Sequence, residues 1–228
     1  MMEIDTTKRP RKAATKPSST GTMRDDVRAF KREIILAAAV DAFYSRGFEN
    51  TSVDDIAAAM SVTKAVLYYN FASKLAVLET IVDRTAAWSL EAIERGIAQG
   101  ATPAQKLALL AFHSTAHILE HQKLVAIYFR EERSFPPALL ARTRDVERRC
   151  VELVIVTLEA GIASGDFEAN DSRLMAINII GMISQAFYWY REGGRLTLDG
   201  VCRHFSDSAL ALVRFSGDLG LSDGAYRP

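Results

Sequence analysis

The sequence has few cysteines and no apolar run long enough to cross a bilayer. Two cysteines, Cys150 and Cys202, cannot form a multi-bridge disulfide framework, and nothing else indicates an oxidising compartment. The most apolar stretch, residues 176–190, is interrupted by Asn178 and Gln185 and fits a buried helix better than a membrane span. No apolar stretch follows the charges near the N-terminus, so we expect no secretory signal. We therefore expect a cytoplasmic protein.

The sequence also lacks net charge, because 28 Lys and Arg balance 28 Asp and Glu. A zero total argues against a nucleic-acid partner, since such proteins usually carry excess positive charge. The charge is unevenly distributed, however: residues 1–74 hold 12 basic and 9 acidic side chains, whereas residues 75–228 hold 16 and 19. The N-terminal third is cationic, and the total charge therefore does not exclude DNA binding.

Residues 1–24 have few apolar side chains and hold six basic residues against two acidic ones. Such a segment cannot bury enough surface to fold alone, so we expect a disordered basic arm. Two interpretations stay open. The arm is either an inert leader or a segment that follows DNA phosphates. The remaining composition, 49% hydrophobic and 25% charged, is that of a globular protein and excludes disorder along the whole length.

Helical periodicity dominates the rest of the chain, and no segment shows the sustained alternation of a strand. We therefore expect an all-α protein of about nine helices, in a three-helix domain over residues 25–74 and a larger helical domain over residues 75–228. Caps, prolines and glycines place the helices at about 28–46, 53–60, 63–70, 74–99, 103–120, 123–133, 137–164, 172–192 and 197–215.

The first three helices have the pattern of a helix-turn-helix, in which two short helices follow a longer one. Gly47 is placed to end the first helix in a left-handed conformation. Ser52 and Asp55 have the spacing of a capping box at the start of the second. The third helix, 63–70, is then the recognition helix that enters the major groove, and its first residues meet base edges.

Candidate DNA-binding residues follow from this geometry. Lys64 can donate to guanine or phosphate, Val66 can touch a thymine methyl, and tyrosine hydroxyls can reach phosphate. A helix N-terminus also favours an anion, which adds Thr51 and Ser52. The full set of candidates is Arg28, Thr51, Ser52, Thr63, Lys64, Ala65, Val66, Tyr68, Tyr69, Asn70 and Lys74.

A plainer interpretation makes Leu67, Tyr68 and Tyr69 ordinary core residues, and for Leu67 we accept it. Adjacent residues on a helix point about 100° apart, so both tyrosines cannot be buried together with Leu67. We therefore favour contact with DNA for the two tyrosines.

About 45 residues of this region resemble the DNA-binding domain of TetR-type transcriptional regulators. The resemblance rests on Ile35-x3-Ala39-x3-Phe43-x3-Gly47-Phe48, on Thr51-Ser52-Val53-x2-Ile56-Ala57, and on Val62 to Phe71 followed by Ser73-Lys74. It implies a homodimer that binds a palindromic operator, usually as a repressor, and an all-helical C-terminal domain for a small inducer and for dimerisation. The chain departs from the family at Ser61, where Gly is frequent and a positive φ would strain Ser, and at Asn70, where His is frequent. Asn70 keeps the chemistry to bind phosphate or adenine.

A more distant resemblance concerns the C-terminal domain. Residues 127–133 with Pro136-Pro137 and Leu139, and the later Gly161, Gly165-Asp166-Phe167, Gly181 and Trp189, are similar to TetR-type regulators that sense acyl-CoA thioesters. A long apolar pocket with a few basic groups would suit such a ligand. Candidate ligand residues are Trp88, His117, Tyr128, Met182, Gln185 and Trp189, with Arg130 or Arg148 for a carboxylate or phosphate; for each one a role in the core is the simpler alternative.

His113, His117 and His121 repeat every four residues along one helix face. A pair at this spacing can chelate a metal, but the outer two lie about 12 Å apart along the axis, so three cannot easily bind one ion. We favour a structural or ligand-pocket role and expect no metal and no cofactor.

The dimer interface is expected on the last two helices, which carry more apolar surface than one core needs. The residues concerned are Ile177, Ile180, Ile183, Phe187, Tyr190, Phe205, Ala209, Leu212 and Val213.

The sequence thus predicts a ligand-responsive transcriptional regulator that is not an enzyme. Its expected partners are double-stranded operator DNA, a small inducer such as an acyl-CoA, and a second copy of the chain, with no membrane. Two alternatives stay open. One is an architectural DNA-binding protein without an inducer, against which a deep cavity would argue. The other is an enzyme that uses the histidine row or Cys202 with His204, for which no ordered set of nucleophile, base and orienting group is evident.

Overall fold

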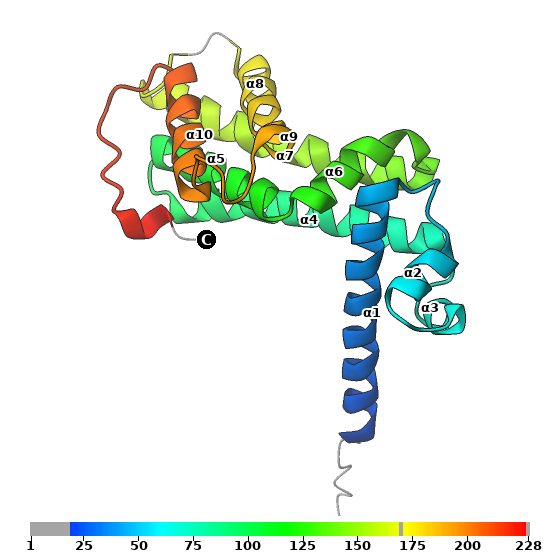
Figure 1. The fold of residues 1–228 in the computed structure, drawn as a ribbon. Coiled ribbons are helices and arrows are strands. Elements are labelled where there is room, and N and C mark those ends of the chain that lie inside the picture. The colour runs from blue at the N-terminus through cyan, green and yellow to red at the C-terminus, as the bar shows by residue number, and fades with distance from the viewer. Residues whose placement is uncertain (1–18, 169–170, 227–228) are drawn as a thin grey trace, which may run out of the picture.

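The structure is a computed structural model that describes residues 19–168 and 171–226. Helices are the regular structure of these residues, which confirms the all-α prediction (Figure 1). In chain order they are α1 Ser19–Arg46, α2 Val53–Ala59, α3 Lys64–Asn70, α4 Lys74–Gln99, α5 Pro103–Glu120, α6 Gln122–Glu131, the 3-10 turn η1 Glu132–Ser134, α7 Pro137–Ser164, α8 Ser172–Ser184, α9 Ala186–Trp189, α10 Leu198–Leu212 and the 3-10 turn η2 Asp223–Tyr226.

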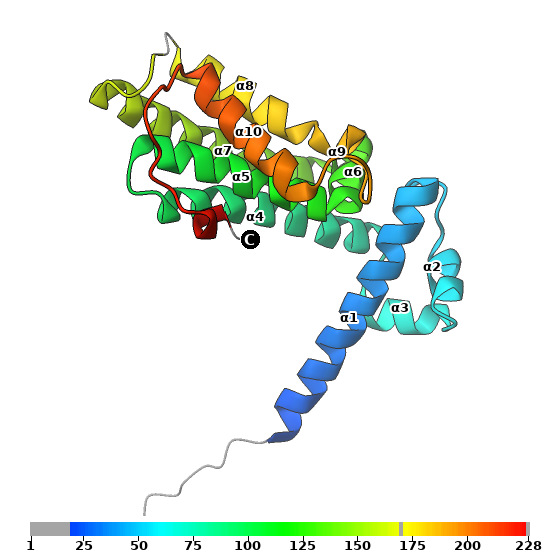
Figure 2. The ribbon, with the colours of Figure 1, turned by 60° about the vertical axis from the view of Figure 1, so that its left-hand side comes forward.

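The first helix is longer than the sequence predicts. It begins at Ser19, so the expected arm over residues 1–24 is wrong for residues 19–24, which form the first turns of α1. Residues 1–18, the remainder of that arm, lie outside the described residues. In Figure 2, α1 projects well beyond α2 and α3, away from the rest of the protein.

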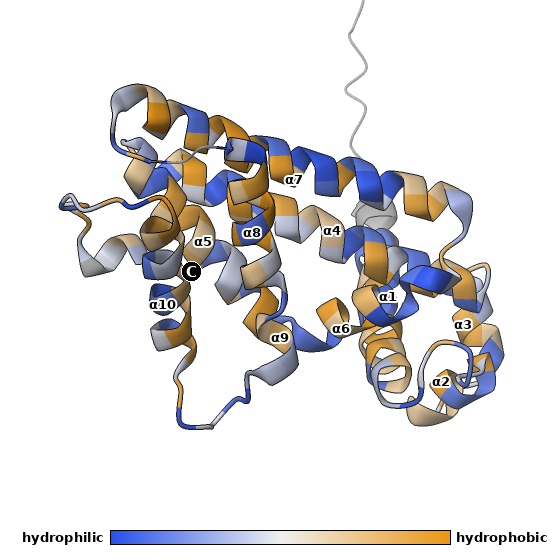
Figure 3. Cartoon of the chain, turned by 90° about the horizontal axis from the view of Figure 1, so that it is seen from above, coloured by the Kyte–Doolittle hydropathy of each residue, from blue (hydrophilic) through white to orange (hydrophobic). Residues whose placement is uncertain are grey.

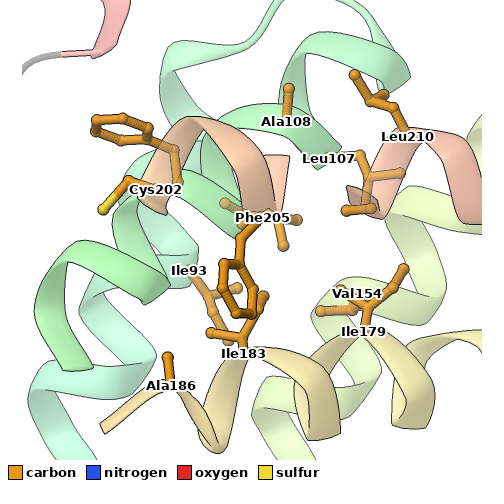
Figure 4. Close-up of a cluster of buried hydrophobic side chains, with 14 of the residues drawn as sticks. Ile93, Leu107, Ala108, Val154, Ile179, Ile183, Ala186, Cys202, Phe205 and Leu210 are labelled. Atoms are coloured by element: carbon orange, nitrogen blue, oxygen red, sulfur yellow. The ribbon is translucent and has the colours of Figure 1, made fainter. Parts of the chain in front are cut away.

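The apolar side chains form two cores. One lies among α1, α2, α3, the first half of α4, α6 and the start of α7, with Ile35, Phe43 and Ile56 fully buried. The other fills the larger helical bundle, where Val154, Ile183 and Phe205 converge between α5, α7, α8 and α10 (Figure 4). Helix α4 contributes to both, which makes it the long connection between the two parts of the fold.

Local capping explains where most helices begin. Thr102 and Gln105 form a capping box in front of Pro103, and the Ser73 side chain accepts from the Ala76 amide at the start of α4. Gly165, with φ of 80°, ends α7 in the left-handed conformation. The predicted starts at Val53, Lys74, Pro103, Pro137 and Ser172 are confirmed.

The helix expected over 172–192 is wrong in its second half, because the chain breaks at Gln185 into α8 and the short α9. The break brings Phe187 flat against Phe129 of α6, with ring centroids 5.5 Å apart. The Gln122 side-chain amide then donates to the carbonyl of Tyr190, 3.2 Å away, where α9 has ended. Aromatic packing against α6 thus accompanies the end of the regular helix.

Within the described residues no single helix is long and apolar enough to cross a membrane. The bent pair α3 and α4 meets the same test by length and composition, but the apolar face of α4 is buried against its neighbours.

Helices α4 and α5 approach each other closely at Gly96. A Cβ placed there would lie 2.6 Å from the carbonyl carbon of Leu109 and would overlap the backbone of Leu110. No flexible side chain can yield at this contact. By contrast, a Cβ at Gly181 of α8 meets nothing within 4 Å.

We therefore predict that Gly96→Ala lowers the free energy of unfolding by about 1–3 kcal/mol, because the two backbones must separate. Gly181→Ala is the matched control and should leave stability unchanged or raise it by up to about 1 kcal/mol through helix propensity. Urea unfolding followed by circular dichroism measures both. Equal effects of the two substitutions would contradict the close approach.

Candidate functional site

The turn between α2 and α3 is tight and strained at one residue. Ser61 has φ of 55°, a conformation that favours glycine, and its amide donates to the carbonyl of Ala58. The strain expected at this departure from the family pattern is therefore present. The turn is followed by Thr63, which stands in extended conformation at the N-cap of α3.

Helices α2 and α3 pack against α1 and α4 through apolar side chains on one side only. Ile56 of α2 and Leu67 of α3 are fully buried with Phe71 against α1 and α4. The capping box predicted at Ser52 is present, with the Ser52 amide and hydroxyl both bonded to the Asp55 carboxylate. These contacts fix α3 with its opposite side facing outward.

The outward side of α3 carries most of the predicted DNA-binding residues. Tyr68 and Tyr69 are 52% and 74% exposed, whereas Leu67 is fully buried. The plainer interpretation, in which both tyrosines belong to the core, is therefore wrong. Thr63, Lys64 and Ala65 are also exposed at the start of α3, and Val66 is half-buried. Ser52, the N-cap of α2, is exposed as well.

Two cations lie beside this surface. The Arg28 guanidinium stands 6.0 Å from the centre of the Tyr69 ring, so α1 adds a positive charge near α3. The Lys64 ammonium lies 3.6 Å from Asp54, but both side chains are largely exposed. A surface pair of this kind contributes little stability, so Lys64 is free to exchange Asp54 for another anion.

Three predicted DNA-binding residues are placed differently from the others. Thr51 is 1% exposed and donates to the carbonyl of Gly47, 2.7 Å away. Asn70 is 4% exposed, and its amide nitrogen donates to the carbonyl of Val66. Lys74 donates to the carbonyl of Phe48, 2.7 Å away, and lies over the Phe48 ring. These side chains hold the backbone in place and do not stand on the outward side of α3.

The turn between α1 and α2 is also bound by α6. Arg130 donates to the carbonyls of Phe43 and Tyr44 in the last turn of α1, and the Phe43 carbonyl also accepts from the Gly47 amide. The neighbouring Glu131 is nearly buried and accepts from the Phe48 amide at 3.2 Å. We call this pair, Arg130 and Glu131, the α6 clamp. Arg130 was predicted to bind a ligand, but its guanidinium is engaged here instead.

The larger domain encloses a cavity of about 340 Å³. Its walls come from α4, α5, α6, α7 and α8 and are almost wholly apolar. Typical wall residues are Ala86, Ile93, Leu110, Val125, Val154 and Ile183. A cavity of this size and character is typical of a small-molecule site.

Two of the predicted ligand residues, His117 and Tyr128, line this cavity. Trp88 lies on the other side of α4, and Trp189 stacks on Phe205 with ring centroids 6.1 Å apart. Met182 packs against the bundle core, while Gln185 marks the break after α8. Arg148 pairs with Asp145 at the surface.

Sequence reasoning missed Glu147 and Ser114, which add polar groups to the cavity beside the predicted His117 and Tyr128. The Tyr128 hydroxyl donates to Glu147 Oε1 at 2.7 Å, which joins α6 to α7. Burial and the nearby Glu147 carboxylate raise the pKa of Tyr128 far above its usual range. Ser114 Oγ and His117 Nε2 are buried without a hydrogen-bond partner. Two polar atoms on one wall are thus left to be satisfied by a ligand or by water.

The two histidines of α5, His113 and His117, do not form one group with His121, which follows the helix. His113 bonds to the Gln99 side chain at 2.7 Å, whereas His117 and His121 cluster with Trp88 beside a second, polar cavity of about 300 Å³. Within the part of the chain that the structure describes, no set of three or more His, Cys, Asp or Glu is arranged to hold a metal ion.

Cys202 and His204 do not form a catalytic pair in this fold. Cys202 is fully buried, and burial raises the pKa of its thiol to about 12, so it is no nucleophile at neutral pH. His204 lies on the exposed side of α10.

The predicted dimer surface needs correction. Five of its residues are buried in the chain's own core and cannot contact a partner: Ile183, Tyr190, Phe205, Ala209 and Val213. On the last three helices, the large apolar side chains that are exposed are Leu174 and Ile177 of α8, Tyr188 and Trp189 of α9, and Leu212 of α10. Hydrophobic residues recur along α8 in Figure 3, since one side of this helix packs inward and the other is uncovered.

The buried histidines predict a pH dependence. Burial lowers the pKa of His113 and of His117 to about 4 from the usual 6.5. The unfolded chain therefore binds protons in this range that the folded chain does not, and stability falls as the pH drops from 6.5 towards 4.

In His117→Gln the free energy of unfolding should fall less steeply as the pH drops, by up to about 1.4 kcal/mol per pH unit. The variant lacks one histidine that takes up a proton only in the unfolded chain. His204→Gln removes an exposed histidine and should keep the slope of the unchanged protein. Urea unfolding across that pH range measures the slopes. Identical slopes for the three proteins would show that His117 is not buried in neutral form.

Comparison with known sequences agrees with this arrangement. Residues 35–81 match the family described as bacterial regulatory proteins of the tetR family, and residues 91–213 match the tetracyclin repressor-like C-terminal domain. The transcriptional repressor KstR2 of Mycolicibacterium smegmatis is 25% identical over 182 residues, which cover 78% of this chain and 87% of that protein.

Solved structures show the same fold. KstR2 of Mycobacterium tuberculosis, a ketosteroid transcriptional regulator, aligns with a TM-score of 0.72 and 27% identity over 79% of this chain and 93% of that one. AibR, solved with isovaleryl coenzyme A and operator DNA, aligns with a TM-score of 0.69 and 23% identity over 80% and 97% of the two chains. With both domains matched in order, and more than half of its residues within the C-terminal match alone, this chain belongs to the TetR family of bacterial regulatory proteins.

Proposed function

We propose that this protein is a ligand-responsive transcriptional repressor that binds a palindromic operator as a homodimer. Residues 25–74 read DNA, and residues 75–228 bind the ligand and the partner subunit. One observation carries the proposal: α4 begins within the helix-turn-helix and ends along the wall of an apolar cavity. A regulator of this kind acts in the cytoplasm, where its DNA target lies.

The outward side of α3 supports DNA reading. Lys64 and Thr63 lie at the N-terminal end of the helix, where base edges are contacted, and Val66 offers a methyl group to thymine. The hydroxyls of Tyr68 and Tyr69 suit phosphate oxygens, as do Ser52 and Arg28 beside them. Ala65 is small enough to let the helix approach the groove. Thr51, Asn70 and Lys74 contribute by holding α3 and the preceding turn in position.

The uncovered apolar side of α8 and α9 supports dimerisation. Leu174, Ile177 and Tyr188 are each about half exposed or more, and exposed apolar patches of this kind mark protein contacts. A palindromic operator requires two recognition helices related by a two-fold axis. A dimer in which the same surface patch of both subunits is in contact has this symmetry.

The cavity supports a small, mainly apolar inducer. His117 and Tyr128 line it, and two ligand classes fit the lining: an apolar molecule with a small polar end, and the acyl end of a thioester such as the acyl-CoA suggested by the sequence. The isovaleryl coenzyme A bound to AibR is an example of the second class in a protein of the same fold.

Helices α4 and α6 connect the cavity with the DNA-binding domain, residues 25–74. Helix α4 lines the cavity with Thr85 and Ser89 and packs Val77 against α1. Helix α6 lines it with Tyr128 and holds the end of α1 through the α6 clamp. A ligand that binds better to a state with displaced α4 and α6 changes the spacing of the two recognition helices and weakens operator binding.

The cavity argues against an architectural DNA-binding protein, which would have no use for an enclosed apolar space. Catalysis finds little support, because Cys202 is buried and its thiol stays protonated at neutral pH. The relatives compared above are transcriptional regulators. We therefore propose that the chain is not an enzyme.

DNA binding is tested by fluorescence anisotropy with labelled DNA from upstream of the chain's own gene. Lys64→Ala should weaken binding at least about tenfold and reduce the salt slope by about two, because the homodimer loses one contact to phosphate or guanine in each half-site. Arg173→Ala removes a cation whose ion pair with Glu152 has the same 3.6 Å separation but lies on α8, and it should leave binding unchanged. Binding that is insensitive to salt and to sequence would contradict the proposal.

A further inference from the structure

The charge at the cavity distinguishes between the two ligand classes that the proposed function leaves open. This inference rests on the proposed ligand site. Among the described residues that line the cavity there is no Lys or Arg, and Glu147 brings the negative charge. Glu147 and Phe129 are exposed while the deeper walls are buried, so these two residues mark the rim where the cavity opens to solvent.

The Glu147 carboxylate is held at this rim. One of its oxygens accepts a hydrogen bond from the Tyr128 hydroxyl, with 2.7 Å between the two oxygens, so Tyr128 has no donor left for a ligand. The other carboxylate oxygen remains an acceptor. A ligand end that reaches the rim therefore meets a negative charge and a hydrogen-bond acceptor, which favours a donor or a cation and repels an anion.

Three arginines lie within one turn of Glu147 on α7, and none of them lines the cavity: Arg144, Arg148 and Arg149. Arg148 pairs with Asp145 at 3.0 Å and Arg149 pairs with Glu94 at 2.6 Å. The two guanidiniums are thus already matched by carboxylates. Arg130, the other arginine expected to receive an anion, is occupied in the α6 clamp.

Deeper in the cavity, two polar atoms can form hydrogen bonds with a ligand group that carries no charge. Ser114 Oγ and His117 Nε2 lie buried on α5 without partners, and burial lowers the pKa of His117 to about 4, so its ring is neutral at pH 7. They suit an uncharged polar group within the apolar body of a ligand, such as a hydroxyl or a carbonyl.

We propose that the cavity takes an amphiphile with an apolar body and a cationic or uncharged hydrogen-bond-donating end, and that Glu147 selects this end at the rim. Free carboxylates are disfavoured, because they would stand beside Glu147 in a partly desolvated site. The thioester carbonyl of an acyl-CoA only accepts hydrogen bonds, so at the rim it would bring neither a donor nor a cation to the Glu147 carboxylate. The inducer is then an amine or an alcohol rather than a fatty acid or its thioester.

Three compounds with one skeleton test the proposal directly: phenylbutylamine, phenylbutanol and phenylbutyrate, with butyryl-CoA as a fourth probe. Isothermal calorimetry on the full chain measures their dissociation constants without DNA. We expect the amine and the alcohol to bind at least about tenfold more tightly than phenylbutyrate and butyryl-CoA.

Glu147→Gln should bring the amine and the carboxylate to within about threefold of each other, since the charge is lost and an acceptor remains. Glu159→Gln is the matched control. It removes an exposed carboxylate further along α7, outside the cavity, and should keep the full preference. Tyr128→Phe keeps the charge of Glu147 and should also keep the amine preferred over the carboxylate, so it remains informative if Glu147→Gln folds poorly.

Equal or tighter binding of phenylbutyrate or butyryl-CoA would overturn the inference, and so would an unchanged preference in Glu147→Gln. Binding of none of the four compounds would overturn it as well. The result is separable from the proposed function, because an absence of operator binding would refute the regulator and leave the measured ligand preference standing.

Discussion

The α6 clamp is the constraint on which the arrangement of the two domains depends. Arg130 satisfies carbonyls at the end of α1, and Glu131 binds the amide of Phe48 in the turn that follows. From the opposite side, Lys74 at the start of α4 binds the carbonyl of Phe48. The turn is thus held between α4 and α6, and both of these helices also line the cavity. In the proposed mechanism, any ligand that moves α6 must either move the DNA-binding domain, residues 25–74, or break these hydrogen bonds.

Much of the fold could be predicted from the sequence, because short-range chemistry sets the helix ends. Ser52 with Asp55 and Thr102 with Gln105 form capping boxes that can be recognised from their spacing, and Gly165 ends its helix as expected. The outward side of α3 also follows from periodicity, since burial of Leu67 forces Tyr68 and Tyr69 outward. These features depend on residues within a few positions of one another.

The errors concern contacts that no sequence pattern shows. Asn70 has the chemistry to bind DNA, but its side chain turns back to the carbonyl of Val66 inside the domain. Arg130 has the chemistry to bind an anion, but the end of α1 lies beside it and takes its donors. The pairing of Tyr128 with Glu147 depends on how α6 meets α7. The ligand preference proposed from Glu147 therefore needed the three-dimensional structure.

The most direct test of the account is the operator affinity of Arg130→Met, measured together with ligand affinity in the same preparation. The methionine side chain would keep much of the apolar stem but could not bond to the carbonyls of α1. The account predicts that operator binding weakens at least about tenfold, because α3 loses its fixed orientation, while the dissociation constant for phenylbutanol changes less than about threefold. Unchanged operator affinity, with the protein folded, would contradict the central role given to α6.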